Sequence, residues 1–177
     1  MEAISKTSKV EKIIKLTLIT IIGSILITIS AKTKIPFYPV PMTMQTFVIL
    51  LIGITLGYKI GLATVALYLL EGLLGLPVFA NSPEKGIGVV YFVGPTMGYL
   101  IGFLFAVYFA GLFKYDKGII NTFLKLIFSV SFIYVIGIAW LGILIGWEKP
   151  IFKLGAQPFL LAELFKILLL LFLVPNL

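Results

Sequence analysis

The chain has 177 residues, of which 60% are hydrophobic and only 12% are charged, so it is too apolar for a water-facing globule and is expected to be an integral membrane protein. All 14 basic residues are lysines, which give a net charge of +7 but never cluster with aromatic residues, and this argues against nucleic-acid binding. The absence of cysteine and histidine excludes disulfides and the commonest metal ligands, and no catalytic residues, metal site or cofactor are expected.

The apolar segments follow one another along the whole chain. They cover about residues 13–30, 44–56, 60–74, 93–113, 119–145 and 159–174. The first is somewhat long for a signal peptide and is expected to stay as an uncleaved span. The second and third are joined by "GYK" and are each short for a full span, so they are expected to be tilted or to form a partly re-entrant hairpin. The pattern predicts an all-α membrane protein, a single domain over residues 1–177 with six transmembrane helices.

The lysines are distributed unequally if the six crossings alternate. The side that holds the termini has seven, Lys6, Lys9, Lys12, Lys15, Lys59, Lys114 and Lys117. The other side has five, Lys32, Lys34, Lys85, Lys149 and Lys153. The positive-inside rule therefore favours both termini in the cytoplasm.

The three longer loops, rich in proline and glycine, then share the outer face. Irregular backbone at membrane depth must be buried or line a cavity. The loops predict a pocket open to the outside, or else they are structured connectors.

Small residues recur every four positions in three segments. The longest stripe consists of Gly94, Gly98, Gly102, Ala106 and Ala110, and a shorter one of Gly53, Gly57 and Gly61. Both indicate close helix packing within the chain. A small polar stripe in the first segment is formed by Thr20, Ser24 and Thr28. It suits packing against a helix of a partner protein and, equally, packing inside the chain.

Polar side chains inside the apolar segments are candidates for chemistry. Gln45 opens the second segment after "YPVPMTM", and its amide suits a urea-like ligand or an interhelical hydrogen bond. Glu163 and Lys166 share one helix face at a spacing of three residues. A charge at the bilayer centre costs about 2.5–3.5 kcal/mol, so the two form either an ion pair or a site for a polar ligand. Lys125 can snorkel to the inner surface, and Glu71 has no evident role.

Four motifs, "VPMTMQT", "LYLLEGLLGLPVFA", "GPTMGYLIGF" and "QPFLLAELFK", resemble those of the BioY family, the biotin-binding S components of energy-coupling-factor (ECF) vitamin transporters. The resemblance covers about residues 36–166 in matching order and spacing. It implies six helices with biotin held beneath the outer loops, in a prokaryotic cell membrane. It also implies a membrane T component and two ATPase subunits as partners, and a binding subunit rather than an enzyme.

The resemblance also implies the residues that meet biotin. Carried onto this chain, the polar contacts are Asn81, Glu163 and Lys166, although the family usually has Asp where this chain has Glu163. The ureido group of biotin needs an acceptor and a donor, and its carboxylate needs a cation or a backbone donor. The predicted site comprises Gln45, Phe79, Asn81, Lys85, Tyr91, Phe92, Glu163 and Lys166. The alternatives are an S component for a different vitamin and an ion-coupled carrier, which would have ionisable residues throughout the membrane depth.

Overall fold

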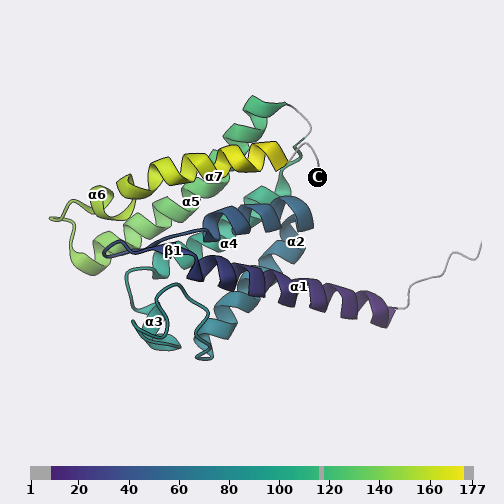
Figure 1. Cartoon of the computed structure of the whole chain (residues 1–177), viewed down its shortest axis with the longest axis horizontal. Coiled ribbons are helices and arrows are strands. Elements are labelled where there is room, and N and C mark those ends of the chain that lie inside the picture. The colour runs from purple at the N-terminus through teal and green to yellow at the C-terminus, as the bar shows by residue number, and fades with distance from the viewer. Residues whose placement is uncertain (1–8, 116–117, 174–177) are drawn as a thin grey trace, which may run out of the picture.

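The computed structural model describes residues 9–115 and 118–173. Within them the regular secondary structure is helical apart from one two-stranded sheet (Figure 1). The elements are α1 (Lys9–Lys32), β1 (Lys34–Ile35), β2 (Met42–Thr43), α2 (Gln45–Leu73), α3 (Val89–Phe92), α4 (Met97–Leu112), α5 (Ile119–Ile145), α6 (Ile151–Gly155), the 3₁₀ helix η1 (Gln157–Phe159) and α7 (Leu160–Leu173). Lys6, Lys117 and the end of the last predicted segment at position 174 lie outside the described residues.

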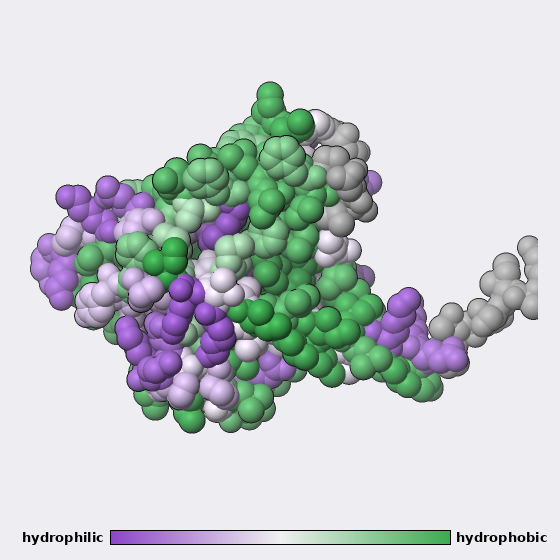
Figure 2. All heavy atoms as spheres, viewed as in Figure 1, coloured by the Kyte–Doolittle hydropathy of each residue, from purple (hydrophilic) through white to green (hydrophobic). Residues whose placement is uncertain are grey.

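The apolar helices agree with a membrane protein. In the described part of the chain, four helical stretches are long and apolar enough to cross a bilayer, over residues 10–32, 45–73, 119–145 and 151–173, and α4 is a shorter apolar helix. Polar residues gather at the end of the molecule that carries β1, α3 and α6, while an apolar surface covers the helices beside them (Figure 2). The all-helical membrane fold predicted from composition is therefore confirmed.

The second and third predicted segments form α2, which folds back on itself. Its backbone leaves the helical region at Gly57 (φ 74°, ψ 168°), a conformation that glycine adopts without steric cost. A Cβ atom built on Gly61 would lie 3.7 Å from the Cα of Gly53. In an unbroken helix, two residues eight positions apart are separated by about 12 Å. Residues 45–56 and 58–73 are thus the first and second arms of a helical hairpin.

The glycine stripes lie where helices approach most closely. A Cβ atom on Gly98 would be 2.6 Å from the carbonyl oxygen of Ile136, and one on Gly102 would be 2.5 Å from the Cα of Ile133, so both glycines face α5. A Cβ atom on Gly53 would be 2.8 Å from the Cβ of Ala110, at the contact of α2 with α4. The two stripes therefore provide the internal packing that the sequence predicts.

A β-hairpin links α1 to α2 and lies at the polar end of the molecule. β1 and β2 are antiparallel, with Lys34 opposite Thr43 and Ile35 opposite Met42. The proline-containing segment of residues 36–41 forms the turn between the strands. The hairpin thereby brings Thr43 and the start of α2 next to α7 (Figure 1).

We expect Gly102→Ala to lower the free energy of unfolding by about 1–3 kcal/mol, because the added methyl group would meet the backbone of α5. Thermal unfolding of the detergent-solubilised protein, followed by circular dichroism, would measure this. Ala139→Leu enlarges an exposed side chain of α5 and serves as the control, with an unchanged midpoint. A Gly102→Ala protein as stable as wild type would show that α4 and α5 lie farther apart.

Candidate ligand-binding site

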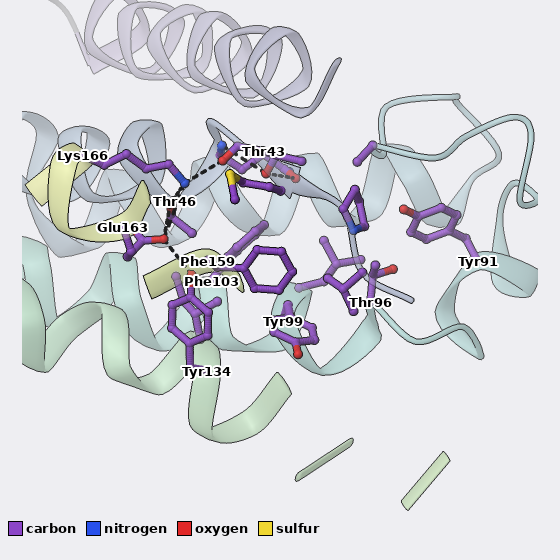
Figure 3. Close-up of a pocket in the computed structure, with 17 residues that line it drawn as sticks. Thr43, Thr46, Tyr91, Thr96, Tyr99, Phe103, Tyr134, Phe159, Glu163 and Lys166 are labelled. Atoms are coloured by element: carbon purple, nitrogen blue, oxygen red, sulfur yellow. Dashed lines mark hydrogen bonds and ion pairs between the residues drawn. The ribbon is translucent and has the colours of Figure 1, made fainter. Parts of the chain in front are cut away.

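A cavity opens among the β-hairpin, α2, α4, α5 and α7 (Figure 3). Counted with its opening to solvent, its empty volume is about 560 Å³. Its apolar wall includes Val40, Pro41, Leu100, Phe103, Ile133 and Phe159. The polar lining includes Thr43, Gln45, Thr46, Tyr91, Thr96, Tyr99, Tyr134, Glu163 and Lys166. This combination of apolar walls and a few convergent polar groups is typical of a ligand site.

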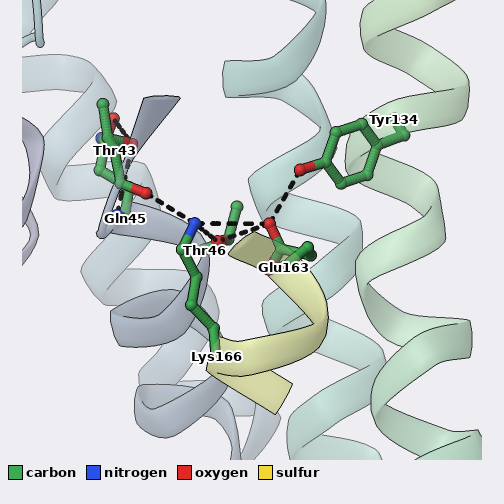
Figure 4. Close-up of polar contacts among 6 residues, drawn as sticks. All are labelled: Thr43, Gln45, Thr46, Tyr134, Glu163 and Lys166. Atoms are coloured by element: carbon green, nitrogen blue, oxygen red, sulfur yellow. Dashed lines mark hydrogen bonds and ion pairs between the residues drawn. The ribbon is translucent and has the colours of Figure 1, made fainter. Parts of the chain in front are cut away.

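Three donors converge on one carboxylate oxygen, Oε2 of Glu163 (Figure 4). The hydroxyl groups of Tyr134 and Thr46 donate to it at 2.8 and 3.0 Å. The ammonium group of Lys166 lies 3.5 Å away. Only 4% of Glu163 and 8% of Lys166 is exposed. Buried charges are tolerated when they are paired and hydrogen-bonded, and this network meets that condition for Oε2.

Lys166 also holds the hairpin to α7. Its ammonium group donates to the backbone carbonyl of Thr43 at 2.7 Å and to the hydroxyl oxygen of Thr46 at 3.0 Å. The same lysine therefore neutralises Glu163 and fixes the cavity wall formed by β2 and the start of α2.

The other carboxylate oxygen of Glu163, Oε1, has no hydrogen-bond partner among the described residues although it is buried. An unsatisfied buried acceptor costs about 1–3 kcal/mol. Glu163 is part of the cavity lining, so this carboxylate lies beside the space that a ligand would occupy. The arrangement is suited to binding a small molecule with hydrogen-bond donors.

Gln45 lines the same cavity, but its amide is already engaged within the protein. Its Nε2 donates to the hydroxyl of Tyr68 at 2.8 Å, and its Oε1 accepts from the hydroxyl of Thr43 at 3.2 Å. The hydroxyl of Tyr68 donates in turn to the carbonyl of Val78 at 3.3 Å. Gln45 thus joins the two arms of α2 to the loop that follows them, which is the structural alternative predicted from the sequence.

Four of the predicted biotin contacts line the cavity, and four do not. Gln45, Tyr91, Glu163 and Lys166 belong to its lining, whereas Phe79, Asn81, Lys85 and Phe92 lie outside it. Phe79 is buried behind the wall and stacks on Tyr91 with ring centroids 4.6 Å apart. The side chain of Asn81 accepts from Lys34 at 3.2 Å, and exposed Lys85 lies 5.6 Å from the ring centroid of Tyr38. These three side chains support or flank the wall instead of facing the cavity.

Sequence reasoning missed Thr46 and Tyr134, the two hydroxyl donors to Glu163. Tyr134 is a polar group within an apolar span, but the same span also contains Thr122, Ser129 and Ser131, so no local signal distinguished it. The hydroxyl of Tyr99, another missed lining residue, donates to the carbonyl of Gly155 at 2.8 Å. It therefore attaches α4 to α6 at the edge of the cavity.

In the stripe on α1, Ser24 packs inside the chain and is not free for a partner helix. It is completely buried, and its hydroxyl donates to the carboxylate of Glu71 on the second arm of α2. The hydroxyls of Thr20 and Thr28 donate to carbonyls of α1 itself. The internal alternative thus holds at Ser24, because the buried hydroxyl supplies a donor to a carboxylate, and this contact also gives Glu71 a structural role.

An all-helical membrane fold with a buried polar network beside a cavity defines a membrane protein that binds a small molecule. The model of the BioY family matches residues 4–177, and the chain belongs to the BioY family. It is 36% identical over 141 residues to the probable biotin transporter BioY of Pyrococcus horikoshii, covering 80% of this chain and 82% of that protein. It is 37% identical over 143 residues to the biotin transporter BioY of Thermotoga maritima, covering 80% and 83%.

The fold is similar to a crystal structure of the S-component for biotin from an ECF-type ABC transporter. The TM-score is 0.78 at 25% sequence identity, and the match covers 96% of this chain and 93% of that one. The family resemblance indicated by the four motifs is confirmed.

Lys166→Met is expected to lower the free energy of unfolding by about 3–5 kcal/mol, because it leaves the carboxylate of Glu163 buried without its cation. The double variant Glu163→Gln/Lys166→Met removes both charges and should recover most of this loss. Thermal unfolding in the absence of ligand compares the two. Equal stability of the single and double variants would show that the ion pair does not neutralise the carboxylate.

Proposed function

We propose that this chain is the biotin-binding S component of an ATP-driven vitamin uptake transporter. It captures biotin in a cavity that opens to the outside of a prokaryotic cell membrane. The observation that carries the proposal is the unpaired Oε1 of Glu163 at the cavity wall. The ureido group of biotin has two N–H donors and one carbonyl acceptor, and one N–H would satisfy Oε1.

The remaining lining suits the rest of biotin. The ammonium group of Lys166 also lines the cavity, and a ligand carbonyl or carboxylate oxygen would be attracted to this cation. Tyr99, Phe103 and Phe159 present apolar surface for the thioether ring and the valerate chain. Among the predicted contacts, we assign direct ones to Glu163 and Lys166, with Gln45 and Tyr91 at the wall.

We further propose six membrane-crossing segments, with the two arms of α2 counted separately and both termini in the cytoplasm. The seven-to-five lysine count supports this orientation. A T component and two ATPase subunits would supply the energy for transport. An ion-coupled carrier is less well supported, because it would have ionisable residues throughout the membrane depth, whereas the buried ion pair here lies at the cavity. Calorimetry against a panel of vitamins distinguishes biotin from another vitamin as the ligand.

Purified protein is expected to bind biotin without partners or ATP, as measured by isothermal titration calorimetry against a panel of vitamins. Glu163→Gln should weaken binding roughly 5- to 150-fold, because the charged acceptor is lost. Glu148→Gln removes an exposed acid and serves as the matched control. Binding of thiamine or riboflavin but not of biotin would refute the proposed substrate.

The proposed orientation is tested with single cysteines, since the chain has none of its own. Lys59→Cys and Glu84→Cys alter exposed side chains at the turn of α2 and in the loop after it. In intact cells, a membrane-impermeant maleimide should label the Glu84→Cys variant but not the Lys59→Cys variant. The Lys59→Cys variant should be labelled only after the membrane is permeabilised. The reverse pattern would place the cavity on the cytoplasmic side.

A further inference from the structure

Lys32, the last residue of α1, and Lys34, the first residue of β1, make hydrogen bonds to one turn of a distant loop. The ammonium group of Lys32 donates to the carbonyl oxygens of Phe79 and Ser82, both at 2.7 Å. The ammonium group of Lys34 donates to the carbonyl oxygen of Ala80 at 2.5 Å and to Oδ1 of Asn81 at 3.2 Å. Hydrogen bonds from a charged donor are about twice as strong as neutral ones. We call Lys32 and Lys34 the lysine clamp. The clamp ties the turn of residues 79–82 to the end of α1 and the start of β1.

The clamped turn is part of the cavity wall. Ala80 lines the cavity, and on the side away from the lysines the backbone N–H of Asn81 donates to the hydroxyl of Tyr91 at 3.3 Å. Tyr91 also lines the cavity and stacks on Phe79. Burial raises the pKa of Tyr91, so its hydroxyl remains protonated at neutral pH. The turn thus lies between the lysine clamp and a residue that faces the ligand space.

The turn depends on such contacts because it lies outside the regular helices. Residues 80–85 form turns between the second arm of α2 and α3. Without the ammonium groups, the carbonyls of residues 79, 80 and 82 would lose their charged donors. The carbonyl of Phe79 also accepts from the backbone N–H of Ser82 at 3.2 Å, and the carbonyls of Ala80 and Ser82 accept from the lysines. Exposed loops open at lower free-energy cost than core helices. The clamp is therefore placed to keep this section of wall closed.

We propose that Lys32 and Lys34 are positioning residues that hold residues 79–82 against the cavity and thereby set the rate at which bound ligand leaves. This inference rests on the proposed binding of biotin. It gives the two lysines a role in ligand retention besides their contribution to membrane orientation. It also ties α1 to the binding site, because a shift of α1 relative to α2 would draw the ammonium groups away from the turn.

The test is the dissociation of radiolabelled biotin from protein in lipid nanodiscs after addition of excess unlabelled biotin. Lys32→Met/Lys34→Met keeps the aliphatic stems but removes the donors, and dissociation should become roughly 10- to 100-fold faster. Lys32→Arg/Lys34→Arg retains charge and donors and should restore slow release. Lys153→Met removes an exposed lysine of α6 and should release biotin at the wild-type rate.

The possible outcomes distinguish a failure of the clamp proposal from a failure of the proposed biotin binding. Wild-type protein that binds no biotin refutes the function itself. Wild-type protein that binds biotin, combined with unchanged release from the double Met variant, overturns the clamp. If the double variant does not fold, the single variants Lys32→Met and Lys34→Met take its place, and unchanged release from both has the same meaning.

Amide hydrogen exchange distinguishes positioning from general destabilisation. In the Met variants, protection should fall in residues 79–82 and be kept in α5. An equal loss of protection in both segments would overturn the proposal, because the lysines would then stabilise the whole fold and not this wall.

Discussion

The carboxylate of Glu163 must be neutralised inside a protein that is itself surrounded by lipid. The donors come from three separate parts of the chain, with Lys166 on α7 beside it, Thr46 on the first arm of α2, and Tyr134 on α5. Because a buried charge is tolerated only with its partners in place, these helices are constrained to meet at one point. The cavity forms beside that point, so the same interaction positions the helices and the polar part of the site.

The glycine stripes make this convergence possible. Gly98 and Gly102 let α4 approach the backbone of α5, and Gly53 lets the first arm of α2 approach α4. Tyr99 and Phe103, on the same helix α4, consequently line the cavity between these neighbours. Close packing and the cavity lining therefore come from neighbouring positions of one helix, and a larger residue in a stripe would displace the cavity wall as well as the helix.

The sequence predicted what depends on local pattern and missed what depends on distant contacts. The apolar segments, the turn at "GYK" and the shared face of Glu163 and Lys166 follow from composition and helical spacing. The convergence of Tyr134 on Glu163 joins positions 29 residues apart, and one of several hydroxyl groups in an apolar span does not identify its partner. Lys32 and Lys34 were assigned only to membrane orientation, since a lysine that binds carbonyls some 47 residues away has no local signature.

The unpaired Oε1 of Glu163 has a thermodynamic consequence for binding. Glu163 lines the cavity, so in the proposed site a ligand donor would meet an acceptor that no other described residue occupies. The three groups around Oε2 hold the carboxylate in place before the ligand arrives, which reduces the entropy lost on binding. A residue that satisfied Oε1 from within the chain would make the empty protein more stable and the site weaker.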